Sequence, residues 1–114
     1  MRRGRSARIL EKNIRDKLEE LGFETSTVSM RDGFTMFMVE KGQKRLLVWI
    51  RCSPITEKAI NLYKKIAGKY AVSGYLTLKF YEPSDYIPLP GQLNAIKVNS
   101  IEDALKKILE VLSK

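Results

Sequence analysis

Arginine side chains are concentrated at the start of this 114-residue chain, where they could bind phosphate groups. Four of the first eight residues are arginines, namely Arg2, Arg3, Arg5 and Arg8. The planar guanidinium presents five N–H donors in a fork that matches phosphate oxygens. We expect residues 1–5 to form a basic arm, with Ser6 capping the helix that follows. A terminus that only solubilises the protein would have the same composition.

The chain as a whole is also basic, with 21 lysines and arginines against 13 aspartates and glutamates and a net charge of +8. Such a charge favours an anionic partner such as nucleic acid. Four further cations are placed where they could add phosphate contacts: Lys12, Lys44, Arg45 and Arg51. A thermophile-like surface, rich in Lys and Glu, is the alternative explanation of the charge.

Two acidic residues stand out by their positions in the chain. At about 100° per residue, Glu11 falls within about 20° of Leu18, on the apolar face of the first predicted helix. Asp32 lies in a turn that precedes a predicted strand. Simpler explanations are an ion pair between Glu11 and Arg8 or Arg15, and a turn role for Asp32.

Other chemistry is excluded by the residues that the sequence lacks. With no histidine, a classical zinc site and a Ser-His or Cys-His nucleophile are ruled out. Cys52 is the only cysteine, so no disulfide forms within the chain. Its neighbour Arg51 could favour the thiolate, but a small buried residue at a strand end is the simpler interpretation. No run approaches the roughly 18 to 20 apolar residues of a membrane helix, and we expect a cytoplasmic protein.

Five strands and three helices are predicted to position these residues. The uninterrupted apolar run from Leu46 to Ile50 indicates that residues 45–52 form a strand buried on both faces at the centre of a sheet. The other strands are expected at residues 23–30, 34–40, 74–81 and 95–98, with a hairpin turn at Gly42. The apolar stripe of the first helix consists of Ala7, Leu10, Ile14, Leu18 and Leu21.

The second and third helices have recognisable start signals. Ser53 at an N-cap and Pro54 at the first helical position are expected to open the second helix. The segment from Ser100 to Asp103 is a capping box that opens the third. The order α-β-β-β-α-β-β-α predicts one α/β domain over residues 1–114, with a central mixed sheet of about five strands flanked by helices.

Residues 3–80 resemble the archaeal Holliday junction resolvases of the restriction-endonuclease-like, PD-(D/E)xK superfamily. The resemblance comprises a basic glycine-containing start, an amphipathic helix that ends in Leu-Gly-Phe at residues 21–23, a β-hairpin, and a crossover from Thr56 to Phe80. The crossover ends in Gly-Tyr-Leu-Thr-Leu-Lys-Phe, which is similar to the family's strand after its second helix. The resemblance implies a restriction-endonuclease-like fold and a DNA substrate.

In that family, an acid on the second strand and a Glu-x-Lys pair on the third hold a divalent metal ion, and an acid on the first helix completes the site. The resemblance places Glu11 at the helix position. When the hairpin glycine is aligned on Gly42, the other positions fall on Met36, Trp49 and Arg51. Methionine and tryptophan cannot bind Mg²⁺, and arginine stays protonated.

The resemblance therefore implies a site that has lost catalysis, with Glu11, Asp32 and Arg51 as relics and with no metal or other cofactor. Met36, Met38 and Trp49 are expected to share one sheet face, where sulfur–aromatic packing fills the place of the metal.

Three functions remain open at this point. The first is a catalytically inactive resolvase-like protein that binds branched or duplex DNA as a homodimer. Its phosphate contacts would come from Arg2, Arg3, Arg5, Arg8, Lys12, Lys44, Arg45 and Arg51. The second is a protein-interaction subunit that modulates an active paralogue or another DNA-processing protein. The third is a structure-specific endonuclease with a migrated site, which alone would require Mg²⁺.

Overall fold

The computed structural model describes residues 3–31, 33–80 and 94–113, with side chains from Ala7 onward. The expected order of three helices and five strands is confirmed. In chain order the elements are α1 (Arg3–Glu20), β1 (Glu24–Arg31), β2 (Phe34–Lys41), β3 (Lys44–Arg51), α2 (Glu57–Ala67), β4 (Gly74–Phe80), β5 (Ala95–Val98) and α3 (Ile101–Leu112).

The five strands form one mixed sheet in the order β1-β2-β3-β4-β5. The first three strands pair antiparallel, whereas β3, β4 and β5 run parallel to one another. The central position predicted for the apolar run is confirmed, because β3 has two strands on either side and Leu46 to Ile50 are buried. Gly42 turns the β2–β3 hairpin with a φ of 61°, a conformation that glycine adopts without strain.

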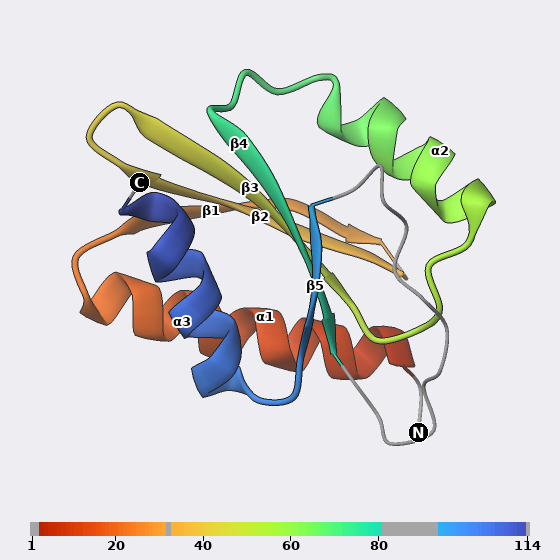
Figure 1. Ribbon diagram of the computed structural model, residues 1–114, viewed down its shortest axis with the longest axis horizontal. Coiled ribbons are helices and arrows are strands. Elements are labelled where there is room, and N and C mark those ends of the chain that lie inside the picture. Colours follow the sequence, from red (N-terminus) through yellow and green to blue (C-terminus); the bar gives the residue numbers. More distant parts are fainter. Residues whose placement is uncertain (1–2, 32, 81–93, 114) are drawn as a thin grey trace.

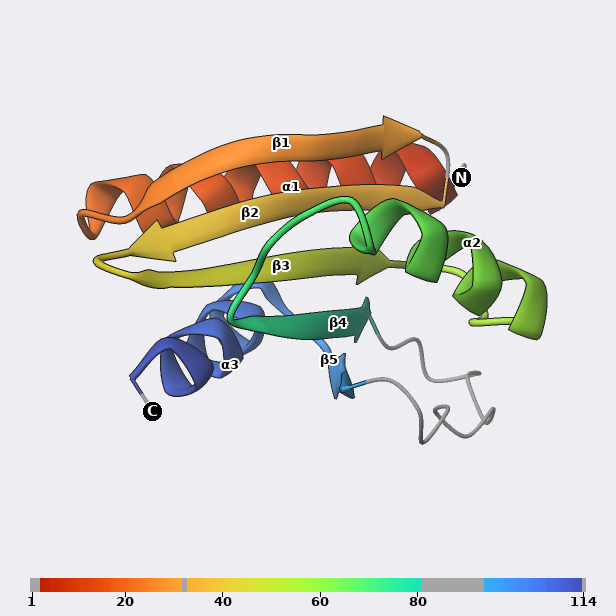
Figure 2. The same cartoon turned by 90° about the horizontal axis from the view of Figure 1, so that it is seen from above.

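Helices cover both faces of the sheet, with α2 on one face and α1 and α3 on the other (Figures 1 and 2). The alternation along β3 follows the prediction. Leu46, Val48 and Ile50 pack in the core beneath α1 and α3. Leu47 and Trp49 pack in the smaller core beneath α2. Residues 46–50 of β3 therefore alternate between the two cores, and this alternation decides which helix each side chain packs against.

The first helix differs from its prediction at both ends. It begins at Arg3 rather than after Ser6, so that residues 3–5 of the expected arm are helical, while Met1 and Arg2 lie outside the described residues. Leu21, expected in the apolar stripe, is 59% exposed. The reason is that α1 ends at Glu20 and Gly22 turns the chain with a φ of 92°, which takes Leu21 off the helical face.

The second helix begins three residues later than predicted, at Glu57 instead of Pro54. Its N-cap is Thr56, whose hydroxyl accepts a hydrogen bond from the Ala59 backbone N–H at 3.1 Å. The Pro54 carbonyl accepts a hydrogen bond from Nη2 of Arg51 at 2.9 Å. That bond holds the chain around Pro54 in a connecting loop. The predicted helix start at Ser53 and Pro54 was therefore wrong.

Replacing Thr56 by alanine is expected to lower the free energy of unfolding by about 1 kcal/mol, because the capping bond to Ala59 is lost. The matched control is Ser53→Ala, which removes the hydroxyl that was expected to cap but does not. Urea unfolding followed by circular dichroism would compare the two variants. A larger loss in Ser53→Ala than in Thr56→Ala would contradict this helix start.

The third helix begins as predicted. The Ser100 hydroxyl accepts a hydrogen bond from the Asp103 backbone N–H at 3.1 Å, and the Asp103 carboxylate lies 3.4 Å from the Asn99 backbone nitrogen. The fifth strand also has its predicted bounds, Ala95–Val98. None of the helices in the described parts of the chain is long and apolar enough to span a membrane.

Candidate functional site

The Trp49 side chain lies fully buried between two other aromatic rings beneath α2. It stacks on Tyr63 of α2, with ring centroids 4.6 Å apart, and on Phe34 of β2, with centroids 5.6 Å apart. Its indole Nε1 donates to the Gly33 carbonyl at 3.0 Å. Met36 pairs with Trp49 across the β2–β3 ladder and belongs to the same core. An aromatic stack therefore occupies the position that the resemblance assigns to a metal-binding carboxylate.

Arg51 continues this arrangement at the end of β3. Its Nη1 donates to the Gly33 carbonyl at 2.8 Å, and its Nε and Nη2 donate to the Pro54 carbonyl. The guanidinium carbon lies 5.6 Å from the ring centroids of both Phe34 and Trp49. Burial lowers the pKa of Arg51, and the neighbouring Cys52 opposes that shift. These contacts make Arg51 a brace between the β1–β2 turn and the loop before α2.

Glu11 lies on the opposite side of the sheet from Met36 and Trp49. It projects from α1 on the face that carries Ile14 and Leu18, and both of these belong to the core beneath α1 and α3. Met36 and Trp49 belong to the core beneath α2. The expectation that Glu11 completes one site with those positions was therefore wrong. The other acidic candidate, Asp32, lies outside the described residues.

On the face of the sheet that α1 covers, where Glu11 lies, the corresponding strand residues are Thr35 on β2 and Val48 and Ile50 on β3, and all three are fully buried. Each precedes by one position the residue that the alignment assigned to the site. A shift of one residue moves every side chain to the other face of a sheet, which explains the error. None of the three side chains is a carboxylate, so neither face supplies the family's set of acids from β2 and β3.

The environment of Glu11 explains its place on an apolar face. Its side chain is 2% exposed, and Oε1 lies 3.6 Å from Nη1 of Arg15, which is the ion pair considered from the sequence. Its Oε2 has no hydrogen-bond partner in the described part of the chain, and neither has the buried Oγ1 of Thr35. Burial raises the pKa of Glu11, and Arg15 only partly offsets that effect.

The Glu11→Gln variant is expected to be more stable than the parent protein near neutral pH. Because burial raises the folded-state pKa above the ordinary 4.5, the folded protein binds this proton more tightly than the unfolded chain does. The stability from Glu11 is therefore present below pH 4.5 and lost as pH rises through the folded-state pKa. Thermal unfolding between pH 4.5 and 8 should show an advantage for Gln that grows with pH. Glu20→Gln, an exposed change on the same helix, should show none.

The basic residues predicted to contact nucleic acid do not form one surface. Lys44 and Arg45 lie at the opposite end of β3 from Arg51, about 20 Å away by strand length. Lys44 donates to the Leu112 carbonyl at 2.9 Å, and Arg45 pairs with Glu40 at 3.0 Å. These two residues are therefore engaged in holding the protein together.

The remaining members of the predicted set lie along α1 and toward its start. Lys12 pairs with Asp16 at 3.0 Å on the exposed face of α1. Arg3 and Arg5 belong to the first turns of α1, and Arg2 lies outside the described residues.

A second group of arginines gathers around the β1–β2 turn. Arg8 is exposed and donates through Nε and Nη2 to the Met30 carbonyl, at 3.1 and 2.7 Å. The exposed Arg31 ends β1, and Arg51 reaches the Gly33 carbonyl in the same turn. We name Arg8, Arg31 and Arg51 the arginine end. Arg31 was missed from the sequence, although its position beside a predicted turn could have placed it here.

Comparisons with known proteins add nothing to this description, because no protein-family model, no curated protein and no solved structure matches the chain. In the described ranges, no three His, Cys, Asp or Glu side chains gather in a way that could hold a metal ion.

Proposed function

We propose that this protein is a catalytically inactive, restriction-endonuclease-like module that binds branched or duplex DNA as a homodimer in the cytoplasm. The observation that carries the proposal is the arginine end, where exposed Arg8 of α1 lies beside the end of β1 and its exposed Arg31. DNA affinity depends largely on neutralising phosphates, and arginine's fork of donors suits that contact.

The fold supports the proposal at the level of topology. Residues 3–80 form an α-β-β-β-α-β unit in which α1 and α2 cover opposite faces of a mixed sheet. This arrangement agrees with the fold that the resolvase resemblance implies for the same residues. Since fold alone does not determine activity, the function has to be argued from the side chains.

The side chains favour binding without cleavage. A hydrolase of this class needs carboxylate oxygens for a divalent ion that activates the attacking water. On the α2 side those positions are taken by Met36, Trp49 and Arg51, and on the α1 side, where Glu11 lies, the strand residues are Thr35, Val48 and Ile50. Arg51 is a structural cation, whereas Arg8 and Arg31 are exposed to solvent, although Arg8 also donates to the Met30 carbonyl.

The proposal is tested with a labelled four-way junction, a duplex and a single strand, each with and without Mg²⁺ or Mn²⁺. We expect binding to the junction and the duplex in low salt and no cleavage of any substrate. Metal-dependent cleavage that disappears in Glu11→Ala or Asp32→Ala would instead establish the endonuclease alternative. A parent protein that binds no DNA in low salt would leave the protein-interaction subunit as the better hypothesis.

A further inference from the structure

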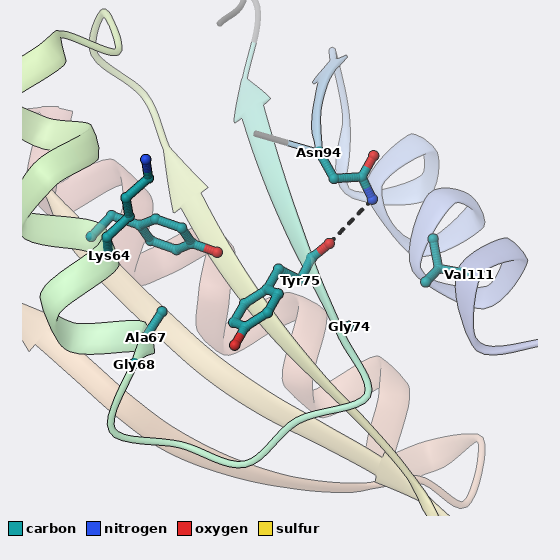
Figure 3. A pocket seen from close by; sticks show the side chains of 8 residues that line it. Lys64, Ala67, Gly68, Gly74, Tyr75, Asn94 and Val111 are labelled. Carbon is teal, nitrogen blue, oxygen red and sulfur yellow. Dashed lines mark hydrogen bonds between the residues drawn. The ribbon is translucent and has the colours of Figure 1, made fainter. Parts of the chain in front are cut away.

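A pocket of about 530 Å³ opens at the end of the sheet remote from the arginine end, between α2 and the start of β4 (Figure 3). The described residues that line it come from α2 and its C-cap, the start of β4, the end of α3 and the residue before β5. Those that carry the argument are Tyr63, Lys64, Tyr75 and Asn94. In Figure 3, Lys64 and Ala67 of α2 lie across from Tyr75, and Asn94 and Val111 lie on the far side of β4.

The pocket exists because β5 is shorter than β4. The parallel ladder between them pairs Thr77 to Phe80 of β4 with Ala95 to Val98, so the first residues of β4 have no β5 partner in the described chain. The Tyr75 carbonyl instead accepts a hydrogen bond from Nδ2 of Asn94 at 3.1 Å. The N–H and C=O of one strand residue point to the same edge, so the Tyr75 N–H also faces this notch.

The lining combines aromatic walls with a few polar groups, as small-molecule sites commonly do. Tyr75 is 42% exposed and presents its ring to the pocket, while Tyr63 is buried against Trp49. Burial raises the pKa of Tyr63 to about 12, an effect partly offset by its hydrogen bond with Thr77. The Tyr63 phenol therefore stays neutral, and Lys64 is the only cation among the described lining residues.

The surface beside the pocket attracts anions. Lys64 is one of four exposed lysines on α2 and the turn after it, the others being Lys58, Lys65 and Lys69. A ligand here would meet flat apolar surface from tyrosine rings, polar groups from Asn94 and the Tyr75 backbone, and a positive charge at the rim. This combination fits a planar heterocycle that carries an anionic group.

We propose that the pocket binds an unstacked nucleobase against Tyr75, with the phosphate of that nucleotide next to Lys64. Stacking on an aromatic side chain tolerates any base, because every base has a π-face. The base could belong to a free mononucleotide or to an unpaired position in DNA. In the second case the inference rests on the proposed function, and it gives the module a means of preferring unpaired tails and branch points over fully paired duplex.

The test compares three ligands, namely dAMP, a single-stranded oligonucleotide and a blunt duplex of the same sequence. Tyr75→Ala is expected to weaken binding of dAMP and of the single strand about tenfold or more and to leave duplex binding unchanged. Tyr75→Phe should bind as the parent does. Lys64→Gln should lower the affinity for dAMP, and Lys64→Arg should keep it at the level of the parent. Calorimetry for dAMP and fluorescence anisotropy for the oligonucleotides provide the affinities.

Two controls match these changes outside the pocket. Tyr70→Ala removes another exposed tyrosine, and Lys65→Gln removes a neighbouring lysine that does not line the pocket. Equal affinity of Tyr75→Ala and the parent for dAMP and the single strand would overturn the pocket assignment, even if salt-sensitive duplex binding upheld the proposed function. Conversely, if the protein binds dAMP in a way that depends on Tyr75 but does not bind duplex DNA, the pocket assignment would be supported and the proposed function overturned.

Discussion

The Trp49→Glu variant is expected to be unfolded under conditions in which the parent protein is folded. Trp49 is fully buried, stacks on Phe34 and Tyr63, and donates to the Gly33 carbonyl. Loss of a core tryptophan costs about 3–5 kcal/mol. A carboxylate in the same place must also be desolvated, which adds to the cost even though Arg51 lies nearby. Since small proteins unfold with a free energy of about 5–15 kcal/mol, the combined loss removes most or all of the stability.

Trp49→Phe is the matched control for this prediction. It keeps an aromatic ring between Phe34 and Tyr63 but removes the Nε1 donor to Gly33, whose hydrogen bond is worth about 1 kcal/mol, and leaves some empty volume. Because Trp49 is the only tryptophan, unfolding should be followed by circular dichroism rather than by fluorescence. A folded Trp49→Glu protein with the parent's stability would show that this position tolerates a carboxylate and would contradict the role of the aromatic stack in the core.

The same argument applies to any attempt to build the resolvase family's metal site into this fold. Installing Asp, Glu and Lys at Met36, Trp49 and Arg51 would break the aromatic stack and the brace to Gly33, and the new carboxylates would still face away from Glu11. We therefore expect the triple variant to lose its fold without gaining nuclease activity. Cleavage by that variant would contradict the assignment of Glu11 to the other face.

Removing Arg8 and Arg31 together is expected to weaken DNA binding strongly and to reduce its dependence on salt. Both side chains are exposed beside the β1–β2 turn, so alanine should leave the core intact. Each phosphate contact on duplex DNA releases about 0.9 counterions, so the loss of two contacts should flatten the plot of log affinity against log salt by nearly two units. The loss should be similar for all sequences, because phosphate contacts do not read bases.

The double variant Lys17→Ala/Lys106→Ala provides the control for net charge. It also removes two exposed cations, but they lie in the last turn of α1 and in α3, away from the arginine end. If the arginine end is the interface, this control should keep most of the affinity and of the salt slope. Equal losses in the two double variants would mean that overall charge drives binding and that no surface is preferred.

The parts of the fold that could be predicted from the sequence are those encoded by local patterns. The apolar run from Leu46 to Ile50 indicated the central strand, Gly42 indicated the hairpin, and Ser100 indicated the third helix. The buried position of Glu11 also followed from helical periodicity alone. In each case the residues that carry the signal lie within a few positions of one another.

The parts that were predicted wrongly are those for which the local pattern allows more than one answer. Ser53 and Thr56 can both cap a helix, and α2 begins after Thr56, while the Pro54 carbonyl accepts a hydrogen bond from Arg51 three residues earlier. The periodicity of α1 shows that Glu11 is buried, but it does not show which face of the sheet α1 covers. That choice separates Glu11 from Trp49.

DNA binding without cleavage is tested most directly by a salt titration of the parent protein on a four-way junction, with Mg²⁺ present and the DNA recovered for analysis. If Arg8, Arg31 and the two arginines in the first turns of α1 each neutralise a phosphate, the slope of log affinity against log salt should lie between about −3 and −4. Affinity should then fall about 100-fold from 50 to 200 mM salt, and the junction should be recovered intact. Salt-independent binding, or a junction cut in the presence of Mg²⁺, would contradict the account.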